Sequence, residues 1–281
     1  MKVTGTLATG VVIGGMTNAL TACSFKAPPN NIKKFGIQLY TLRDVLPSDT
    51  KGILKKIASY GYEQIESYEH EKLGMFWGMT NKDFKKYIDD LGMKFIASHC
   101  DHEKNFEKKA DEASAIGIKY LICPWLGPKK KLDPFKRAAE SFNKAGEICK
   151  QRGIKFGYHN HDYSFKKVEG VYPQDVLMQN TEQSLVDFEM DMYWVVTAGQ
   201  DPVEWMKKYP TRFTLAHVKD GRGGKTSTLG TGAIDYPNIL HEAEKAGLKH
   251  FFIEQEEYEG TTPIAAAQAN AEYMKKLSFK K

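Results

Sequence analysis

Residues 133–159, DPFKRAAESFNKAGEICKQRGIKFGYH, contain one complete helix–strand unit of this chain. Asp133-Pro134 opens an amphipathic stretch that runs to Gln151, with proline in the first turn, where a helix tolerates it best, and Gly153 beyond the end. The apolar and aromatic run Ile154–His159 follows directly, and its length and composition are typical of a buried strand. The stretch therefore predicts an α-helix followed at once by a β-strand.

The same alternation continues in both directions along the chain. Eight runs rich in apolar, β-branched and aromatic residues predict strands at Phe35–Tyr40, Tyr62–Ser67, Lys94–His99, Ile118–Pro124, Ile154–His159, Leu185–Asp191, Phe213–Val218 and His250–Glu254. Amphipathic stretches between them predict helices at Thr50–Tyr60, Asn81–Leu91, Asp133–Gln151, Val203–Tyr209, Asp235–Ala246 and Pro263–Lys275. Strict alternation with short connections implies a parallel sheet.

Eight such units in about 250 residues match the count and size of a (β/α)8 TIM barrel. A doubly wound open sheet is the alternative, but no glycine-rich phosphate loop follows the first predicted strand. Composition shows no internal break. We therefore expect an α/β protein with one barrel domain, residues 34–281.

Composition excludes several classes of protein. The chain has 281 residues, 41% hydrophobic and 27% charged, which are globular values rather than those of a disordered chain. A net charge of +5 spread over this length is weak evidence for nucleic-acid binding, and we expect none. The basic run Lys129–Lys131 beside Pro128 is interpreted as a solvated loop.

The N-terminal segment is interpreted as a targeting signal rather than part of the fold. Residues 1–22 are mildly apolar, and the tetrapeptide Leu20-Thr21-Ala22-Cys23 resembles the lipobox of bacterial lipoproteins, in which the cysteine is acylated. We expect a signal peptide at 1–22, a linker at 23–33, and an exported protein facing the periplasm that meets the membrane only through a lipid on Cys23. The other cysteines have no metal-like spacing and are expected to be buried free thiols: Cys100, Cys123 and Cys149.

Polar side chains gather where the predicted strands end, and this is the edge at which barrel enzymes carry their chemistry. These ends read Ser98-His99, Tyr158-His159-Asn160-His161-Asp162, Glu189-Met190-Asp191, His217-Val218-Lys219-Asp220 and Glu254-Gln255-Glu256. Buried imidazoles and carboxylates need partners, and a shared divalent cation would satisfy several at once. One ligand from each of four adjacent strands gives a mixed nitrogen and oxygen site that suits Mn, Mg, Fe, Co or Zn.

We expect Asp191, His217, Glu254 and one histidine of the fifth strand to bind the metal, with His159 favoured as the ligand and His161 as the base. Alternation along the sixth strand places Glu189 on the face of Asp191, and we expect it to contact substrate. The same substrate role is open for His99, which ends the third strand without a pattern around it.

The strand ends resemble those of the sugar phosphate isomerase/epimerase family, the xylose-isomerase-like barrels. The resemblance covers roughly residues 34–278 and is carried by Gln38-Leu39-Tyr40-Thr41-Leu42-Arg43, Gly157-Tyr158-His159-Asn160-His161-Asp162, Asp191-Met192-Tyr193-Trp194, His217-Val218-Lys219-Asp220, Gly230-Thr231-Gly232-Ala233-Ile234-Asp235 and Ile253-Glu254-Gln255. It implies one divalent metal, held in the epimerases by Glu, Asp, His and Glu. The last three match Asp191, His217 and Glu254, whereas His159 stands where the first glutamate is expected. The exported members with a Tyr-His-Asn-His motif resemble lyases or hydrolases of 3-keto-glycosides.

Isomerisation, epimerisation and elimination beside a ketone all begin with removal of the acidic proton next to the carbonyl. His161 is the expected base, Glu254 adds acid/base work to its ligand role, and Lys219 polarises an oxygen. Flat apolar side chains near strand ends are expected to stack on a sugar, and these are Tyr40, Trp77, Trp125 and Trp194. The segment Lys72–Thr80, which contains Trp77, is expected to form a loop over the mouth.

The sequence thus favours a metal-dependent isomerase, epimerase or lyase that acts on a small-molecule sugar. Expected export and the missing phosphate loop favour a ketosugar or 3-keto-glycoside over a sugar phosphate. The alternative is a non-catalytic, metal-containing carbohydrate-binding barrel. An endonuclease on the same fold is disfavoured because it would need further His and Glu ligands and a basic face. The particular sugar, the particular metal and the oligomeric state stay open.

Overall fold

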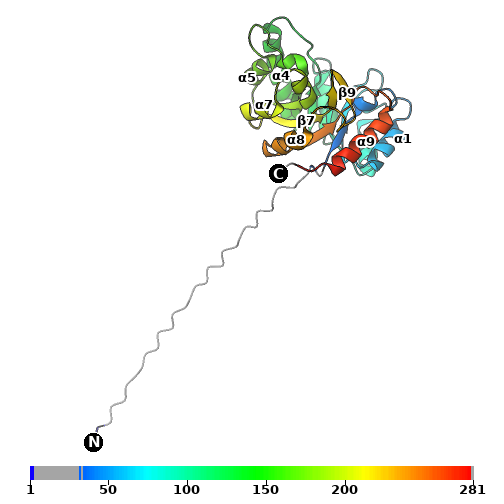
Figure 1. The fold of residues 1–281 in the computed structure, drawn as a ribbon, viewed down its shortest axis with the longest axis horizontal. Coiled ribbons are helices and arrows are strands. Elements are labelled where there is room, and N and C mark those ends of the chain that lie inside the picture. The colour runs from blue at the N-terminus through cyan, green and yellow to red at the C-terminus, as the bar shows by residue number, and fades with distance from the viewer. Residues whose placement is uncertain (3–31, 33, 280–281) are drawn as a thin grey trace.

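The computed structural model describes residues 1–2, 32 and 34–279. The expected signal segment and linker fall almost wholly outside the described residues, and Cys23 lies outside them. The prediction of a single barrel domain is confirmed. Strands line its centre and helices surround them (Figure 1).

Eight parallel strands close into a barrel in the order β1-β10-β7-β6-β5-β4-β3-β2, so neighbours in the chain are neighbours in the barrel. The strands are β1 (Gly36–Gln38), β2 (Gln64–Tyr68), β3 (Lys94–His99), β4 (Tyr120–Cys123), β5 (Lys155–His159), β6 (Val186–Asp191), β7 (Phe213–Val218) and β10 (His250–Ile253). Each falls within or closely overlaps one of the eight runs predicted from the sequence. They are almost wholly buried because helices cover them outside and side chains fill the barrel inside.

The helices are α1 (Thr50–Ser59), α2 (Asn81–Asp90), α3 (Phe106–Ser114), α4 (Asp133–Gln151), α5 (Pro173–Asn180), α6 (Met192–Thr197), α7 (Pro202–Lys208), α8 (Tyr236–Lys245) and α9 (Pro263–Lys276). The first and last of them, α1 and α9, pack side by side and close the outer ring (Figure 1). Predicted helix boundaries agree to within a residue or two because the caps that mark them are in place. Thr80 Oγ1 accepts from Asp83 N at 3.1 Å at the start of α2, for example.

Several shorter elements differ from the sequence prediction. Helices α3, α5 and α6, the 3-10 turns η1 (Leu39–Leu42) and η2 (Asp162–Phe165), and the hairpin of β8 (Asp220–Arg222) with β9 (Lys225–Ser227) were not predicted. The sequence of α6, MYWVVT, is β-branched and aromatic and favours a strand in isolation. It becomes helical because Asp191 caps it, with Oδ1 accepting from Trp194 N at 3.0 Å.

The barrel interior has an apolar floor below its mouth. Leu215 on β7 and Phe252 on β10, both 0% exposed, lie two residues before the predicted ligands His217 and Glu254. Because side chains two residues apart share a face of a strand, these apolar side chains lie beneath the polar ends of β7 and β10. Replacing polar groups in the mouth therefore leaves the core beneath it in place.

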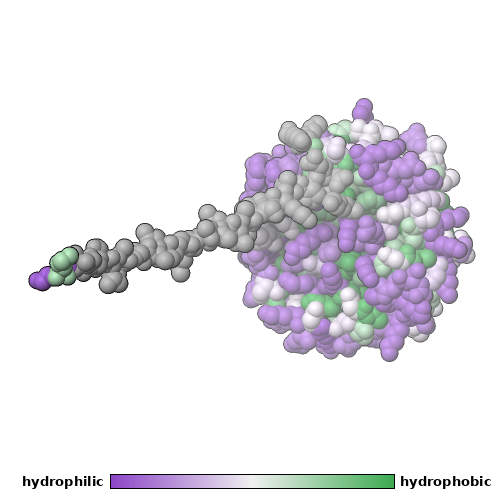
Figure 2. Space-filling model, turned by 90° about the horizontal axis from the view of Figure 1, so that it is seen from below, coloured by the Kyte–Doolittle hydropathy of each residue, from purple (hydrophilic) through white to green (hydrophobic). Residues whose placement is uncertain are grey.

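The outer surface carries mostly hydrophilic residues, with apolar ones scattered among them, in the face that Figure 2 shows. Cys100, Cys123 and Cys149 are free and buried, as predicted. In the described part of the chain, no helix combines the length and the apolar character needed to cross a bilayer.

Candidate active site

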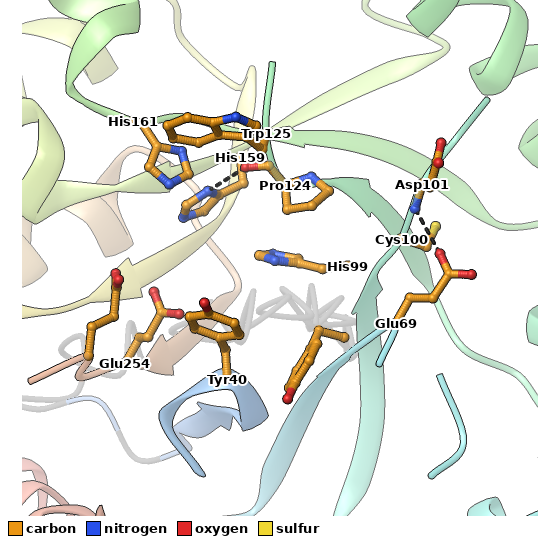
Figure 3. A pocket seen from close by; sticks show the side chains of 12 residues that line it. Tyr40, Glu69, His99, Cys100, Asp101, Pro124, Trp125, His159, His161 and Glu254 are labelled. Carbon is orange, nitrogen blue, oxygen red and sulfur yellow. Dashed lines mark hydrogen bonds between the residues drawn. The ribbon is translucent and has the colours of Figure 1, made fainter. Parts of the chain in front are cut away.

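A cavity of about 470 Å³ opens at the carboxyl ends of the barrel strands. Figure 3 shows its side chains converging from opposite sides of the mouth. It is lined by Tyr40, Tyr68, Glu69, His99, Cys100, Asp101, Pro124, Trp125, His159, His161, Glu254 and Glu256. The volume is in the range of sites for small ligands.

Four buried side chains from adjacent parts of the barrel converge at this cavity. One ligand atom each from His159, Asp191, His217 and Glu254 lies within 4.8 Å of all the others. His217 Nδ1 is 3.1 Å from His159 Nε2 and 3.0 Å from Glu254 Oε2. Asp191 Oδ2 is 3.4 Å from His159 Nε2. These are the four residues that the sequence predicted as metal ligands.

The other ring nitrogen of each histidine has a partner of its own, so the four converging atoms stay available to bind a cation. His159 Nδ1 lies 3.4 Å from the carbonyl of Pro124, and His217 Nε2 lies 2.6 Å from Glu66 Oε2. If both nitrogens donate, His159 Nε2 and His217 Nδ1 keep their lone pairs for a cation. Asp191 Oδ2 is buried and pairs with Lys219 Nζ at 3.0 Å. Two imidazole nitrogens and two carboxylates are a donor set that fits a divalent cation.

A second polar group lies directly beneath the first and shares His217 with it. Glu66, His99, Glu189 and His217 also bring one ligand atom each within 4.8 Å of one another. His99 Nε2 is 2.8 Å from Glu189 Oε2 and 3.4 Å from Glu66 Oε2. Of this group, His99 alone lines the cavity. The two glutamates lie deeper in the barrel, and their contacts with His99 and His217 orient the two imidazole rings.

This arrangement changes one expectation from the sequence and adds one residue that was not predicted. Glu189 was expected to contact substrate, but it is 0% exposed and does not line the cavity. Glu189 lies two residues before Asp191 on β6, so the strand places it about 7 Å deeper in the barrel. Glu66 was not predicted at all. The available signal was a glutamate inside an otherwise buried strand, Gln64-Ile65-Glu66, which needs a polar partner.

The charges of the metal-free cluster are shared between the two layers. Burial alone would lower the pKa of His217, but the carboxylates of Glu189 and Glu254 outweigh it and raise that pKa well above its usual value. Burial, followed by repulsion from Glu189, raises the pKa of Glu66 to about 7. A proton on His217 thus adds positive charge among these carboxylates, and a bound cation would replace it.

Lys219 lies at the centre of the acidic side of the site. Its ammonium nitrogen is 2.7 Å from Glu254 Oε2, 3.0 Å from Asp191 Oδ2 and 2.5 Å from Glu256 Oε1. The side chain is fully buried, and burial alone would lower its pKa, but Asp191 and Glu254 outweigh that effect and raise the pKa well above its usual value. Lys219 is therefore a fixed positive charge that can polarise an oxygen or donate a proton, and it is not a base.

His161 lines the cavity but is not a member of either group of converging ligands. Its ring stacks on Tyr163 and Trp194, with centroids 5.7 and 5.6 Å away, and Trp125 meets it edge-on at 4.4 Å. Its Nδ1 is buried without a hydrogen-bond partner. Burial, followed by the electrostatic effect of His159 and Lys219, lowers the pKa of His161 to about 2, so its imidazole is neutral at physiological pH.

The aromatic side chains are placed partly as expected. Tyr40 and Trp125 line the cavity and are 39% and 54% exposed. Trp77 differs from the expectation, since it is 4% exposed and its Nε1 donates to Ser67 Oγ at 3.0 Å. It packs instead behind Tyr68, with ring centroids 5.1 Å apart, and Tyr68 forms the cavity wall.

Trp194 also stays behind the lining. It stacks on His161, and the Lys219 ammonium lies 5.1 Å from its ring centroid. Trp194 therefore supports two residues of the site and does not itself line the cavity.

Comparison with known proteins agrees with this architecture. Residues 54–277 match the family model described as xylose isomerase-like TIM barrel. An inosose dehydratase of Clostridium perfringens is 36% identical over 142 residues, which are 45% of this chain and 47% of that enzyme. A second inosose dehydratase, from Geobacillus kaustophilus, is 27% identical over 198 residues, which are 60% of this chain and 61% of that enzyme. The matched part is thus about half to three-fifths of these relatives.

Solved structures extend the similarity over most of the chain. A sugar phosphate isomerase/epimerase from Parabacteroides distasonis superposes with a TM-score of 0.74 at 31% identity, covering 88% of this chain and 94% of that one. The structure of an IolI protein with a bound zinc atom has the same fold, with a TM-score of 0.70 at 17% identity over 85% of this chain and 95% of that one. The chain belongs to the xylose isomerase-like TIM barrel family.

Proposed function

We propose that the protein is a divalent-metal-dependent isomerase, epimerase or lyase that removes a proton next to the carbonyl of a ketosugar or 3-keto-glycoside. The observation that carries this proposal is the convergence of four buried ligand atoms, from His159, Asp191, His217 and Glu254, two of which, His159 and Glu254, belong to side chains that line an open cavity. The relatives support it, since one is an inosose dehydratase and another is a sugar phosphate isomerase/epimerase.

The four ligands would hold the cation, which supplies a positive charge that polarises a carbonyl and stabilises the negative charge that develops next to it. The IolI structure, which has the same fold, contains a bound zinc atom, and this supports a divalent cation at the site proposed here. Lys219 supplies a second fixed positive charge beside Asp191 and Glu254. Because this ammonium is buried and already oriented by carboxylates, it need not reorganise when charge develops on the substrate.

His161 is the proposed base. It has a neutral ring, a buried nitrogen without a partner, and a position in the cavity wall outside the ligand set. The burial that lowers its pKa also weakens it as a base. A negative charge that develops on a nearby substrate raises the pKa of an imidazole and offsets this effect. Lys219 cannot take this role because it is protonated.

A substrate without phosphate suits the cavity. Its described lining includes the acids Glu69, Asp101, Glu254 and Glu256 and no lysine or arginine. The nearby cation Lys109 is already bound to Glu69 at 2.7 Å, and Arg43 Nη2 donates to the carbonyl of Glu256 at 2.6 Å. A phosphate would therefore meet net negative charge and no free cation among these residues. A neutral sugar meets hydrogen-bonding groups and the aromatic faces of Tyr40 and Trp125.

The test is deuterium exchange. Protein reconstituted with Mn²⁺ or Zn²⁺ is incubated in D2O with a panel of ketohexoses and 3-keto-glycosides, and NMR follows the carbon next to the carbonyl. The proposal predicts deuterium at that carbon, loss of exchange after chelation, and a product whose structure distinguishes isomerisation or epimerisation from elimination. Binding of these sugars without exchange would contradict it and indicate a carbohydrate-binding barrel instead.

A further inference from the structure

We propose that a second cavity, directly beside the first, binds a second sugar ring of the substrate. This proposal rests on the function proposed above for the first cavity. The second cavity has a volume of about 670 Å³ and shares Cys100, Asp101, Pro124 and Trp125 with the first. The two cavities therefore form one groove along the ends of β3 and β4, with Trp125 at their boundary. Figure 3 shows Trp125 beside His161 and Pro124 on this side of the site.

The boundary residue is fixed in place before any ligand arrives. Trp125 is 54% exposed, yet its ring is held edge-on against His161 and Tyr163, at 4.4 and 5.0 Å. The Tyr163 hydroxyl accepts hydrogen bonds from the backbone N–H groups of Leu126 and Gly127, at 3.0 and 3.2 Å. An exposed indole held this firmly offers apolar surface on which a sugar ring can stack at little entropic cost.

The polar groups of the second cavity suit a neutral polyol. Asp101 and Glu103 supply acceptors and Lys129 supplies a donor, while Arg137, which is paired with Asp133, balances the charge, so neither sign dominates. His102 lines the same cavity, and its Nε2 is buried without a hydrogen-bond partner. Burial lowers the pKa of His102, which leaves its ring neutral. Sugar hydroxyls both donate and accept, so they can satisfy this mixture of acceptors and donors.

Size supports the same division of the substrate. The first cavity, with about 470 Å³, already lies in the range that holds one small ligand. The second, larger volume is then available for a further group attached to that ligand. A glycoside has this shape, with one ring over His159 and His161 and the other on the far side of Trp125. A free monosaccharide would leave the second cavity filled with water.

The test measures binding of unreactive one-ring and two-ring sugars, so that it does not depend on turnover. Dissociation constants for glucose and cellobiose are measured by calorimetry on metal-loaded wild type and on Ser141→Phe. Ser141 lines the second cavity from α4 and does not line the first. The matched control is Glu140→Phe, at the neighbouring exposed position of the same helix.

We expect cellobiose to bind wild type and Glu140→Phe about tenfold more tightly than glucose, or more. In Ser141→Phe this preference should disappear while glucose affinity is kept. If that variant does not fold, Ala138→Trp fills the same cavity from the same helix. Equal affinity of wild type for the two sugars, absence of cellobiose binding, or an unchanged preference in a folded filled variant would overturn the subsite. Failure of deuterium exchange alone would overturn the proposed function and leave this result standing.

Discussion

Glu66→Gln tests how far the lower polar layer supports the proposed metal ligands. Glu66 Oε2 lies 2.6 Å from His217 Nε2, and both side chains are 0% exposed, so no water can take over the bond. Glutamine keeps the shape but replaces a charge-assisted hydrogen bond with a neutral one of about half the strength. The ring of His217 then becomes less basic at Nδ1, the atom that faces Glu254 and His159.

Loss of such a supporting carboxylate typically costs about 10- to 100-fold in metal affinity, or roughly 1.4–2.7 kcal/mol. Because glutamine retains an acceptor, we expect Glu66→Gln at the lower end of this range. The assay is competition with a fluorescent chelator for Mn²⁺ or Zn²⁺ at fixed pH, with unfolding curves to confirm the fold. Glu69→Gln is the matched control, since Glu69 also belongs to this part of the barrel but pairs with Lys109 instead of a proposed ligand. Unchanged metal affinity in Glu66→Gln, or an equal loss in Glu69→Gln, would refute the reasoning.

His161→Asn should keep the metal and slow deuterium exchange about 10²–10⁴-fold, the usual cost of losing a general base. Loss of metal in this variant and its retention in His159→Asn would show that the two roles are reversed. His250, whose burial lowers its pKa from 6.5 to about 4, should make stability pH-dependent. The unfolded chain binds that proton more readily, so the contribution of neutral His250 to the free energy of unfolding is complete above pH 6.5. This contribution, about 3 kcal/mol at most, is lost as pH falls through 4. Denaturant unfolding at several pH values should show a weaker acid loss in His250→Gln, and an identical pH profile would count against this assignment. Export and lipidation at Cys23 remain a proposal, which predicts a membrane-bound wild type and a soluble Cys23→Ala on fractionation. Equal solubility of both, with no lipid on either, would rule it out.

The barrel, and the proximity of the four proposed ligands, could be predicted from the sequence for a simple physical reason. Buried parallel strands are continuous apolar runs, and polar residues at their carboxyl ends stand out against that background. His159, Asp191, His217 and Glu254 each end or directly follow such a run, and the structure brings them together.

Features that depend on contacts between residues far apart in the sequence could not be predicted from it. Glu66 forms a hydrogen bond with His217 although 151 residues separate them in the chain, and the sequence around either residue does not indicate this pair. Trp77 lies in a segment where loop and packing residues look alike, and only the fold shows that its indole binds Ser67 behind Tyr68. The alternation of side chains correctly placed Glu189 on the face of Asp191. It does not show that a side chain two residues earlier on the strand lies too deep in the barrel to reach the cavity.

An anomalous difference map from a crystal soaked in Mn²⁺ would test the central claim most directly. The account predicts one peak, bounded by His159 Nε2, Asp191 Oδ2, His217 Nδ1 and Glu254 Oε2, and its loss in Asp191→Ala, His217→Ala and Glu254→Ala. A peak among Glu66, His99 and Glu189 instead, or no peak at either group, would contradict it.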